Sequence, residues 1–208
     1  MKIFLLDLDE EMTRSWQARF NDIEEVEVVN SEFCSFMKEH INDIAAVVSA
    51  ANSFGLMDGG LDGAYIRFFG KELQDAVQSK LIEEYLGEQP VGSSMIVDIP
   101  GFPGKKLIHT PTMRIPQPIL DPRIVYICTR SALVTAYKNN VGTVLLPAFG
   151  HLTGRLSSEI VSSLMEKAYR DVIGRISDSS ANSWEDVHGK HFGGLDDDLI
   201  AFFRECRI

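Results

Sequence analysis

The chain of 208 residues has a mass of 23.2 kDa, which fits one domain of ordinary size better than two. Hydrophobic residues make up 45% and charged residues 24%, so the chain can bury a core and is neither disordered nor fibrous by composition. The formal net charge of −10 and the lack of a basic stripe disfavour charge-driven binding to bare nucleic acid. A small anion remains possible, because backbone N–H groups at helix N-termini bind phosphate without Lys or Arg.

The cysteines and the N-terminus favour a reducing compartment. The three cysteines, Cys34, Cys128 and Cys206, are widely spaced and fit neither a disulfide framework nor a paired metal knuckle. The apolar start Ile3 to Leu6 is too short and too soon followed by acidic residues for a secretory signal, and no apolar run approaches the ~20 residues that cross a bilayer. We therefore expect a cytoplasmic protein that binds no membrane.

Strand-like and helical patterns alternate along the chain. Apolar runs predict strands at Lys2–Leu8, Val26–Val29, Ala45–Ser49, Ser94–Ile99, Lys106–His109 and Gly142–Pro147. Apolar residues at helical spacing predict helices over Glu72–Leu86, from Pro122 to about Tyr137 with Asp121 as the N-cap, and over Ile160–Ile173. This alternation predicts a three-layer α/β/α domain with a mixed, mostly parallel sheet, whose ligands bind at the carboxyl ends of strands.

The composition changes after Ile176 to a polar run that is typical of a linker. We expect one domain over residues 1–176 and, in residues 177–208, a linker with a short helix from Leu195 to Ile208 docked on that domain. His188 and His191 lie in this segment without a matching Cys or carboxylate pattern, so no metal site is expected there.

The most informative segment is a buried strand that runs into a glycine-rich loop. The strand ends in small residues and Asn52, and a helix begins near Gly63. The loop between them holds Gly55, Gly59 and Gly60. Small residues let a ligand approach the backbone closely, a helix N-terminus donates to anions, and Asn52 can bond sugar hydroxyls. An equally weighted alternative is a tight loop in which Asp62 is simply the helix N-cap.

These residues resemble the macrodomain family. The run Val47–Asn52 followed by Gly59–Ala64 is similar to the family's V-N-A-A-N strand and G-G-G-V-D-G-A loop. Leu107–Thr110 is similar to the family's strand ending in I-H-T, and Val144–Gly154 to its second ligand loop. The resemblance covers roughly Asp43–Ile173 and implies a macrodomain-like fold.

The resemblance also implies the ligand: ADP-ribose or an ADP-ribosylated substrate, with no cofactor and no metal. In the family one loop holds the distal ribose and a phosphate, a second wraps the pyrophosphate, and an acid near the second strand accepts from adenine. The matching first-loop residues are Ala51, Asn52, Gly59, Gly60 and Asp62. The matching second-loop residues are Phe149, Gly150, His151, Leu152, Thr153 and Gly154. The candidate adenine acid is Glu32, where the family has G-D-I.

Two positions depart from the family pattern and leave the function open. Ser49 stands where the first Asn of V-N-A-A-N usually lies, and Ile66 replaces a common histidine. One hypothesis is an enzyme that hydrolyses ADP-ribosyl linkages or ADP-ribose 1″-phosphate, with Asn52 and Asp62 as its catalytic residues and Asp62 acting on water. The alternative is a non-catalytic ADP-ribose reader or nucleotide-signal sensor. In either case, Val at Gly59 or Gly150 is expected to block ligand approach and leave the fold intact.

Overall fold

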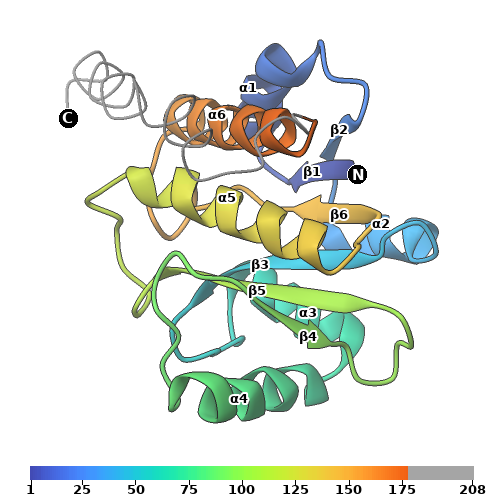
Figure 1. Ribbon diagram of the computed structural model, residues 1–208, viewed down its shortest axis with the longest axis vertical. Helices are drawn as coiled ribbons and strands as arrows, with labels where there is room; N and C mark the ends of the chain where they lie inside the picture. Colours follow the sequence, from blue (N-terminus) through green and yellow to red (C-terminus); the bar gives the residue numbers. More distant parts are fainter. Residues whose placement is uncertain (178–208) are drawn as a thin grey trace. The chain divides into compact units, whose positions relative to one another are not determined.

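A computed structural model of the protein describes residues 1–177 (Figure 1). Contacts between Cα atoms divide the chain into a compact unit, Met1–Tyr169, and a second unit that begins at Arg170. The expected linker and C-terminal helix, with His188 and His191, lie outside the described residues.

A six-stranded sheet forms the centre of the first unit. The strands are β1 (Lys2–Asp7), β2 (Val26–Asn30), β3 (Ala46–Asn52), β4 (Met95–Asp98), β5 (Lys106–Met113) and β6 (Thr143–Leu146), in the order β2-β1-β6-β3-β5-β4. Neighbouring strands are parallel, except that β4 runs antiparallel to β5. The predicted mixed, mostly parallel sheet is confirmed.

Helices cover both faces of this sheet. They are α1 (Glu10–Phe20), α2 (Phe33–His40), α3 (Gly60–Phe69), α4 (Glu72–Tyr85), α5 (Arg123–Lys138) and α6 (Ser158–Ser177). Alternate side chains of β1 show the two layers: Phe4 and Leu6 pack with α2, α3 and α4, whereas Ile3 and Leu5 face residues of α1, α5 and α6. Figure 1 shows α5 and α6 in front of the sheet and α3 behind it. The three-layer α/β/α arrangement is therefore confirmed.

Helices α1 and α2 lie where no helix is expected from the sequence. The Asp9 carboxylate accepts from the N–H groups of Glu11 and Met12, at 2.7 and 3.4 Å, and starts α1. Glu32 starts α2 in the same way, because its carboxylate accepts from Ser35 N–H at 2.8 Å. Each helix thus depends on one capping carboxylate and a few buried apolar side chains, a weak pattern in a short segment.

Several element bounds also differ from the expected ones. Helix α5 begins at Arg123 with Pro122 as its N-cap, although the Asp121 carboxylate still accepts from the Arg123 N–H at 3.0 Å. The expectation of Asp121 as N-cap is therefore wrong by one residue. Strands β3 and β5 extend to Asn52 and Met113, further toward their carboxyl ends than expected.

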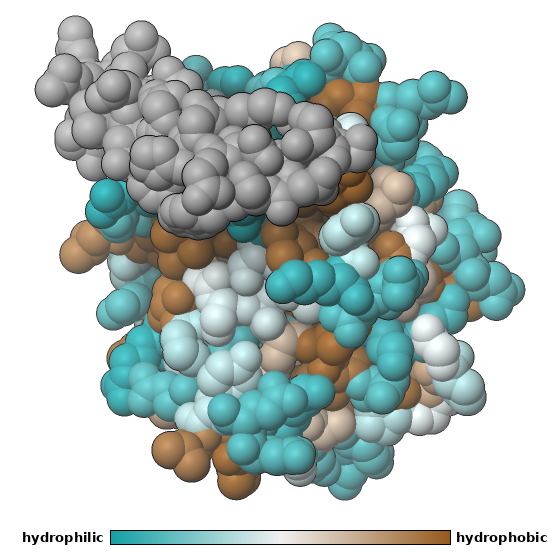
Figure 2. Space-filling view, in the orientation of Figure 1, coloured by the Kyte–Doolittle hydropathy of each residue, from teal (hydrophilic) through white to brown (hydrophobic). Residues whose placement is uncertain are grey.

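The neighbouring strands β3, β5 and β6 run in one direction, so their carboxyl ends meet at one edge of the sheet. The β3–α3 loop (residues 53–59), the segment 114–122 after β5 and the β6–α6 loop (residues 147–157) leave the sheet at this edge. Among the described residues, no helix has the length and apolar character needed to cross a bilayer. Figure 2 shows a mostly hydrophilic exterior on the viewed face, with smaller hydrophobic areas between.

Candidate functional site

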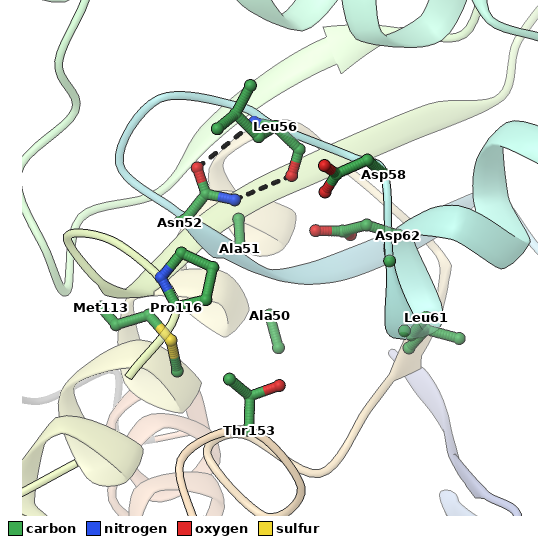
Figure 3. Close-up of a pocket in the computed structure, with 12 residues that line it drawn as sticks. Ala50, Ala51, Asn52, Leu56, Asp58, Leu61, Asp62, Met113, Pro116 and Thr153 are labelled. Atoms are coloured by element: carbon green, nitrogen blue, oxygen red, sulfur yellow. Dashed lines mark hydrogen bonds between the residues drawn. The ribbon is translucent and has the colours of Figure 1, made fainter. Parts of the chain in front are cut away.

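A pocket of about 230 Å³ opens where β3 and β5 end (Figure 3). Its lining comes from the end of β3, the β3–α3 loop, the first turn of α3, the segment after β5 and the β6–α6 loop: Ala50, Ala51, Asn52, Leu56, Asp58, Gly59, Gly60, Leu61, Asp62, Met113, Pro116 and Thr153. Pockets that enclose whole drug-sized ligands hold roughly 300–1,000 Å³. This one therefore fits part of such a ligand, such as a sugar with one phosphate.

The N-terminus of α3 opens into the pocket without a capping side chain. Gly59 is the N-cap, and within residues 1–177 no side chain caps the backbone N–H groups of the first turn. A Cβ on Gly59 or Gly60 would meet no atom within 4 Å, so the backbone here borders open space. Gly60 has a φ of +55°, which favours glycine. The first N–H groups of a helix have no intrahelical acceptor, and they are well suited to bind an anion.

Asp62 lies in the first turn of α3 and bonds to the sheet. The Ser49 hydroxyl donates to Asp62 Oδ1 at 2.6 Å, and Ser49 is fully buried in β3. Since Gly59 occupies the N-cap position, the interpretation of Asp62 as the helix N-cap is wrong. Burial raises the pKa of Asp62 to about 6, the bond from Ser49 opposes this rise, and the charge of Asp58 adds to it. Figure 3 shows both carboxyl groups pointing into the same space.

The amide of Asn52 shapes the β3–α3 loop. Its oxygen accepts from the N–H groups of Phe54 and Leu56, both at 3.2 Å, and its Nδ2 donates to the Leu56 carbonyl at 2.8 Å (Figure 3). A carboxamide nitrogen carries two N–H bonds, so one donor remains for another partner. Asn52 therefore organises the loop whether or not it also contacts a ligand.

The β6–α6 loop closes tightly on itself. Gly150 has a φ of +76°, its carbonyl accepts from Leu156 N–H at 3.1 Å, and Gly154 accepts from Ile119 N–H at 2.9 Å. A Cβ on Gly150 would lie 2.7 Å from the Ile119 side chain. The loop exposes Leu152 and Thr153, and Thr153 reaches the pocket.

His151 ties this loop to the start of α1. Its Nδ1 lies 3.0 Å from the Leu156 carbonyl, and its Nε2 lies 3.1 Å from the Asp9 carboxylate. Both ring nitrogens therefore lie within hydrogen-bond distance of an oxygen atom. The bond to His151 is also the main cause that lowers the pKa of Asp9. The pair holds the β6–α6 loop near the carboxyl end of β1.

The structure brings part of the expected site together. The expected residues that line the pocket are Ala51, Asn52, Gly59, Gly60, Asp62 and Thr153. Those outside the pocket lining are Glu32, Phe149, Gly150, His151, Leu152 and Gly154. Phe149 is fully buried, so its ring is not presented to a ligand, and the Glu32 carboxylate caps α2.

Other lining residues were not expected as ligand contacts: Ala50, Leu56, Asp58, Leu61, Met113 and Pro116. Asp58 and Leu61 lie within the same glycine-rich run and could have been included with it. Met113 ends β5 and Pro116 follows it, and neither residue belongs to a motif that marks a ligand contact.

His109 is buried in β5, and only one of its ring nitrogens is bonded within the described residues. Nδ1 lies 2.6 Å from Gln89 Oε1, whereas Nε2 is buried without a partner in the described part of the chain. Burial lowers the pKa of His109 to about 3, so the ring is neutral. Among residues 1–177, no group of three or more His, Cys, Asp or Glu side chains is arranged to hold a metal ion.

The fold and the two loops define a macrodomain. The family model described as "Macro domain" matches residues 48–165, more than half of the chain, and the protein belongs to this family. The matched residues contain most of β3, all of α3, β5 and β6, and every residue that lines the pocket among those the structure describes.

Curated relatives share moderate sequence identity with the chain. An uncharacterized protein of Aquifex aeolicus is 29% identical over 157 residues, which cover 71% of this chain and 91% of that protein. An O-acetyl-ADP-ribose deacetylase of Salmonella gallinarum is 33% identical over 107 residues, or 50% of this chain and 58% of that enzyme. The same enzyme of Escherichia fergusonii is 37% identical over 67 residues, or 32% and 37% of the two chains. The chain thus spans less than two thirds of either deacetylase.

Solved structures share the fold. A macrodomain of Oceanobacillus iheyensis, solved as a point mutant, has a TM-score of 0.55 and 20% identity, covering 74% of this chain and 87% of that one. The macrodomain of Mycobacterium tuberculosis DarG has a TM-score of 0.53 and 23% identity, covering 62% and 84%. The Trypanosoma brucei macrodomain in complex with ADP has a TM-score of 0.54 and 20% identity, covering 65% and 54%.

Proposed function

We propose that this protein binds ADP-ribose through the pocket and hydrolyses an ADP-ribosyl linkage, with Asp62 as the catalytic carboxyl group. One observation carries the proposal: a carboxyl group with a pKa near 6 lies beside the uncapped N-terminus of α3 in an open pocket. A carboxyl group and an anion site side by side are suited to a substrate that joins a sugar to phosphate.

The anion would be bound by the backbone. Among residues 1–177, no Lys or Arg lines the pocket, so the N–H groups at the start of α3 would be the main donors to a phosphate there. Thr153 places the exposed part of the β6–α6 loop at the opposite wall, where its backbone would contact the pyrophosphate. The remaining N–H of Asn52 would bond a hydroxyl of the distal ribose, next to Asp62.

Asp62 would then act as a general base. Its free oxygen would take a proton from water as the water oxygen attacks the anomeric carbon and the bond to the leaving oxygen breaks. The proton would pass on to the leaving group, which restores the carboxylate. A negative charge beside the anomeric carbon also stabilises the positive charge that develops there.

Two substrate classes fit attack at the anomeric carbon: an ADP-ribosylated protein side chain and ADP-ribose 1″-phosphate. A third class, O-acetyl-ADP-ribose, would need the water activated by Asp62 to attack the acetyl carbonyl carbon instead, with the ribose oxygen leaving and taking up the proton. This third class is the substrate named for the Salmonella gallinarum and Escherichia fergusonii relatives. The second candidate function is a non-catalytic ADP-ribose reader. One observation favours it: the Asn52 amide makes three hydrogen bonds to the backbone of its own loop. The amide is therefore less free to orient a reacting ribose.

The deciding experiment compares wild type with Asp62→Ala on all three substrates. A hydrolase should lose about a hundredfold or more in kcat while its affinity for ADP-ribose stays nearly unchanged. If the wild type binds ADP-ribose but releases no product from any of the three, the hydrolase proposal fails and the reader replaces it.

A further inference from the structure

One hydroxyl in the sheet is placed to control the proposed catalytic carboxyl group. Ser49 is fully buried in β3, and its O–H donates to Asp62 Oδ1 at 2.6 Å. The other oxygen, Oδ2, has no hydrogen-bond partner within residues 1–177, and the residue lines the pocket. One oxygen is thus tied to the sheet while the other is available to water or substrate.

A second bond holds α3 in place independently of Ser49. The Tyr65 hydroxyl donates to the Val48 carbonyl at 2.8 Å, and Tyr65 is fully buried. Asp62 and Tyr65 are three residues apart and so lie on the same side of the helix. Removing the Ser49 hydroxyl therefore leaves the bond from Tyr65 to Val48 in place, about one turn further along α3. The main effect of the removal falls on the Asp62 carboxyl group.

The other ionisable groups around Asp62 do not favour its charged form. Asp58, from the β3–α3 loop, repels a second negative charge. Tyr65, from α3, is neutral because burial raises its pKa well above the ordinary value. His109, which pairs with Ser49 across β3 and β5, is neutral as well. A hydrogen bond to a carboxylate oxygen favours ionisation, and within the described residues Ser49 supplies the one such bond to Asp62.

We infer that Ser49 is a positioning residue, whose hydroxyl orients Asp62 and keeps its carboxylate form available at neutral pH. The catalytic consequence rests on the proposed hydrolase function, whereas the coupling between the two side chains does not.

The test follows the Asp62 carboxyl carbon by NMR through a pH titration of wild type and Ser49→Ala, with Asp62→Asn assigning the signal. Loss of the bond should move the Asp62 titration midpoint upward by about one pH unit or more. Ser49→Thr keeps a hydroxyl and should bring the midpoint back toward wild type. The matched control is Thr110→Val, which removes a buried hydroxyl of β5 that bonds to Ser94 and not to Asp62.

Activity is measured on the same proteins. Ser49→Ala should lower kcat about twofold at pH 7 and about tenfold at about pH 5, because the rising limb of the pH–rate profile moves upward by about one unit, with the dissociation constant for ADP-ribose changed less than about twofold. An unchanged midpoint in Ser49→Ala, or an equal shift in Thr110→Val, overturns the inference even if wild type is an active hydrolase. If wild type hydrolyses none of the substrates, the proposed function fails, and the midpoint alone decides whether Ser49 controls Asp62.

Discussion

The Ser49 hydroxyl lies 2.6 Å from a carboxyl oxygen of Asp62, and this bond joins the middle of β3 to the first turn of α3. The two residues are far enough apart in sequence that the glycine-rich β3–α3 loop lies between them. The bond thus orients the Asp62 carboxyl group beside the uncapped N-terminus of α3. Partial burial at this position raises the pKa of Asp62 and makes its carboxylate form costly.

Asp62→Asn should stabilise the protein at neutral and alkaline pH. The folded-state pKa of Asp62 is raised from 3.8 to about 6, so its contribution to stability is present below the unfolded value and is lost as the pH rises through about 6. Asn keeps an oxygen for Ser49 and carries no charge. We expect a gain of roughly 1–3 kcal/mol in the free energy of unfolding at about pH 8.

Urea denaturation of both proteins at about pH 8 and about pH 4 measures this effect. The gain should nearly vanish at the lower pH, where wild-type Asp62 is protonated in the folded state. A gain of the same size at both pH values would show that charge at this position is not the cause.

Gly59→Val should block the ligand and leave the fold intact. Gly59 has an extended backbone with a φ of −146°, and its Cβ would point into open space, so the valine side chain would occupy the approach to the α3 N-terminus. We expect at least a tenfold loss in affinity for ADP-ribose by calorimetry, about 1.4 kcal/mol.

The matched control for Gly59→Val is Gly142→Val, because a Cβ at Gly142 also meets no atom within 4 Å and the residue precedes β6 at the opposite end of the strand. Equal losses of ADP-ribose affinity in the two variants would contradict binding at the α3 N-terminus. The same expectation for Gly150→Val is wrong: with a φ of +76° and the Ile119 side chain 2.7 Å from a new Cβ, valine there would distort the β6–α6 loop.

Glu32→Ala tests the proposed adenine contact against the capping role. The carboxylate accepts from Ser35 N–H, so its loss should cost about 1 kcal/mol of stability through α2. If Glu32 also accepts from adenine, ADP-ribose should bind about 1–3 kcal/mol more weakly, whereas ribose 5-phosphate, which has no adenine, should bind as before. Equal weakening of both ligands would mean that the substitution acts through the fold and would argue against an adenine contact.

The sequence predicts the sheet well because each strand is a separate apolar run. It does not predict α1 and α2, whose starts depend on Asp9 and Glu32 acting as caps, a role that acidic residues share with many surface positions. The strand expected at Lys106–His109 also ends too early: β5 continues to Met113 and includes Pro111, a residue that is unusual inside a strand.

The same limit applies to the site. The glycine-rich run identifies one wall of the pocket, since Asn52, Gly59, Gly60 and Asp62 are close in sequence. Met113, at the end of β5, and Pro116, just after it, lie at the pocket only because β5 pairs with β3. The bond from Ser49 to Asp62 likewise depends on the angle at which α3 crosses the sheet, which no local pattern specifies.

Asp9→Asn should loosen the β6–α6 loop while keeping α1 capped. Asn retains an oxygen for the Glu11 and Met12 N–H groups but removes the negative charge that faces His151. Hydrogen exchange in residues 147–157 should become faster, and ADP-ribose should bind about three- to tenfold more weakly if this loop holds the pyrophosphate.

The control for Asp9→Asn is Asp98→Asn, which removes one partner of an exposed ion pair with Lys106. It should change neither exchange in the β6–α6 loop nor ADP-ribose affinity. In the wild type, the hydrogen bond between Asp9 and His151 should also weaken in acid. The pKa of Asp9 is lowered from 3.8, so the stability that this carboxylate contributes is lost as the pH falls through the lowered value. Unchanged exchange in Asp9→Asn would mean that the loop holds its shape without His151.

Calorimetric titration of the wild-type protein with ADP-ribose tests most directly whether the pocket between the two loops is a nucleotide site. The account predicts saturable binding with a dissociation constant in the low-micromolar range or tighter, about −8 kcal/mol, which Gly59→Val weakens and Gly142→Val does not. No heat and no thermal shift with millimolar ADP-ribose would contradict it.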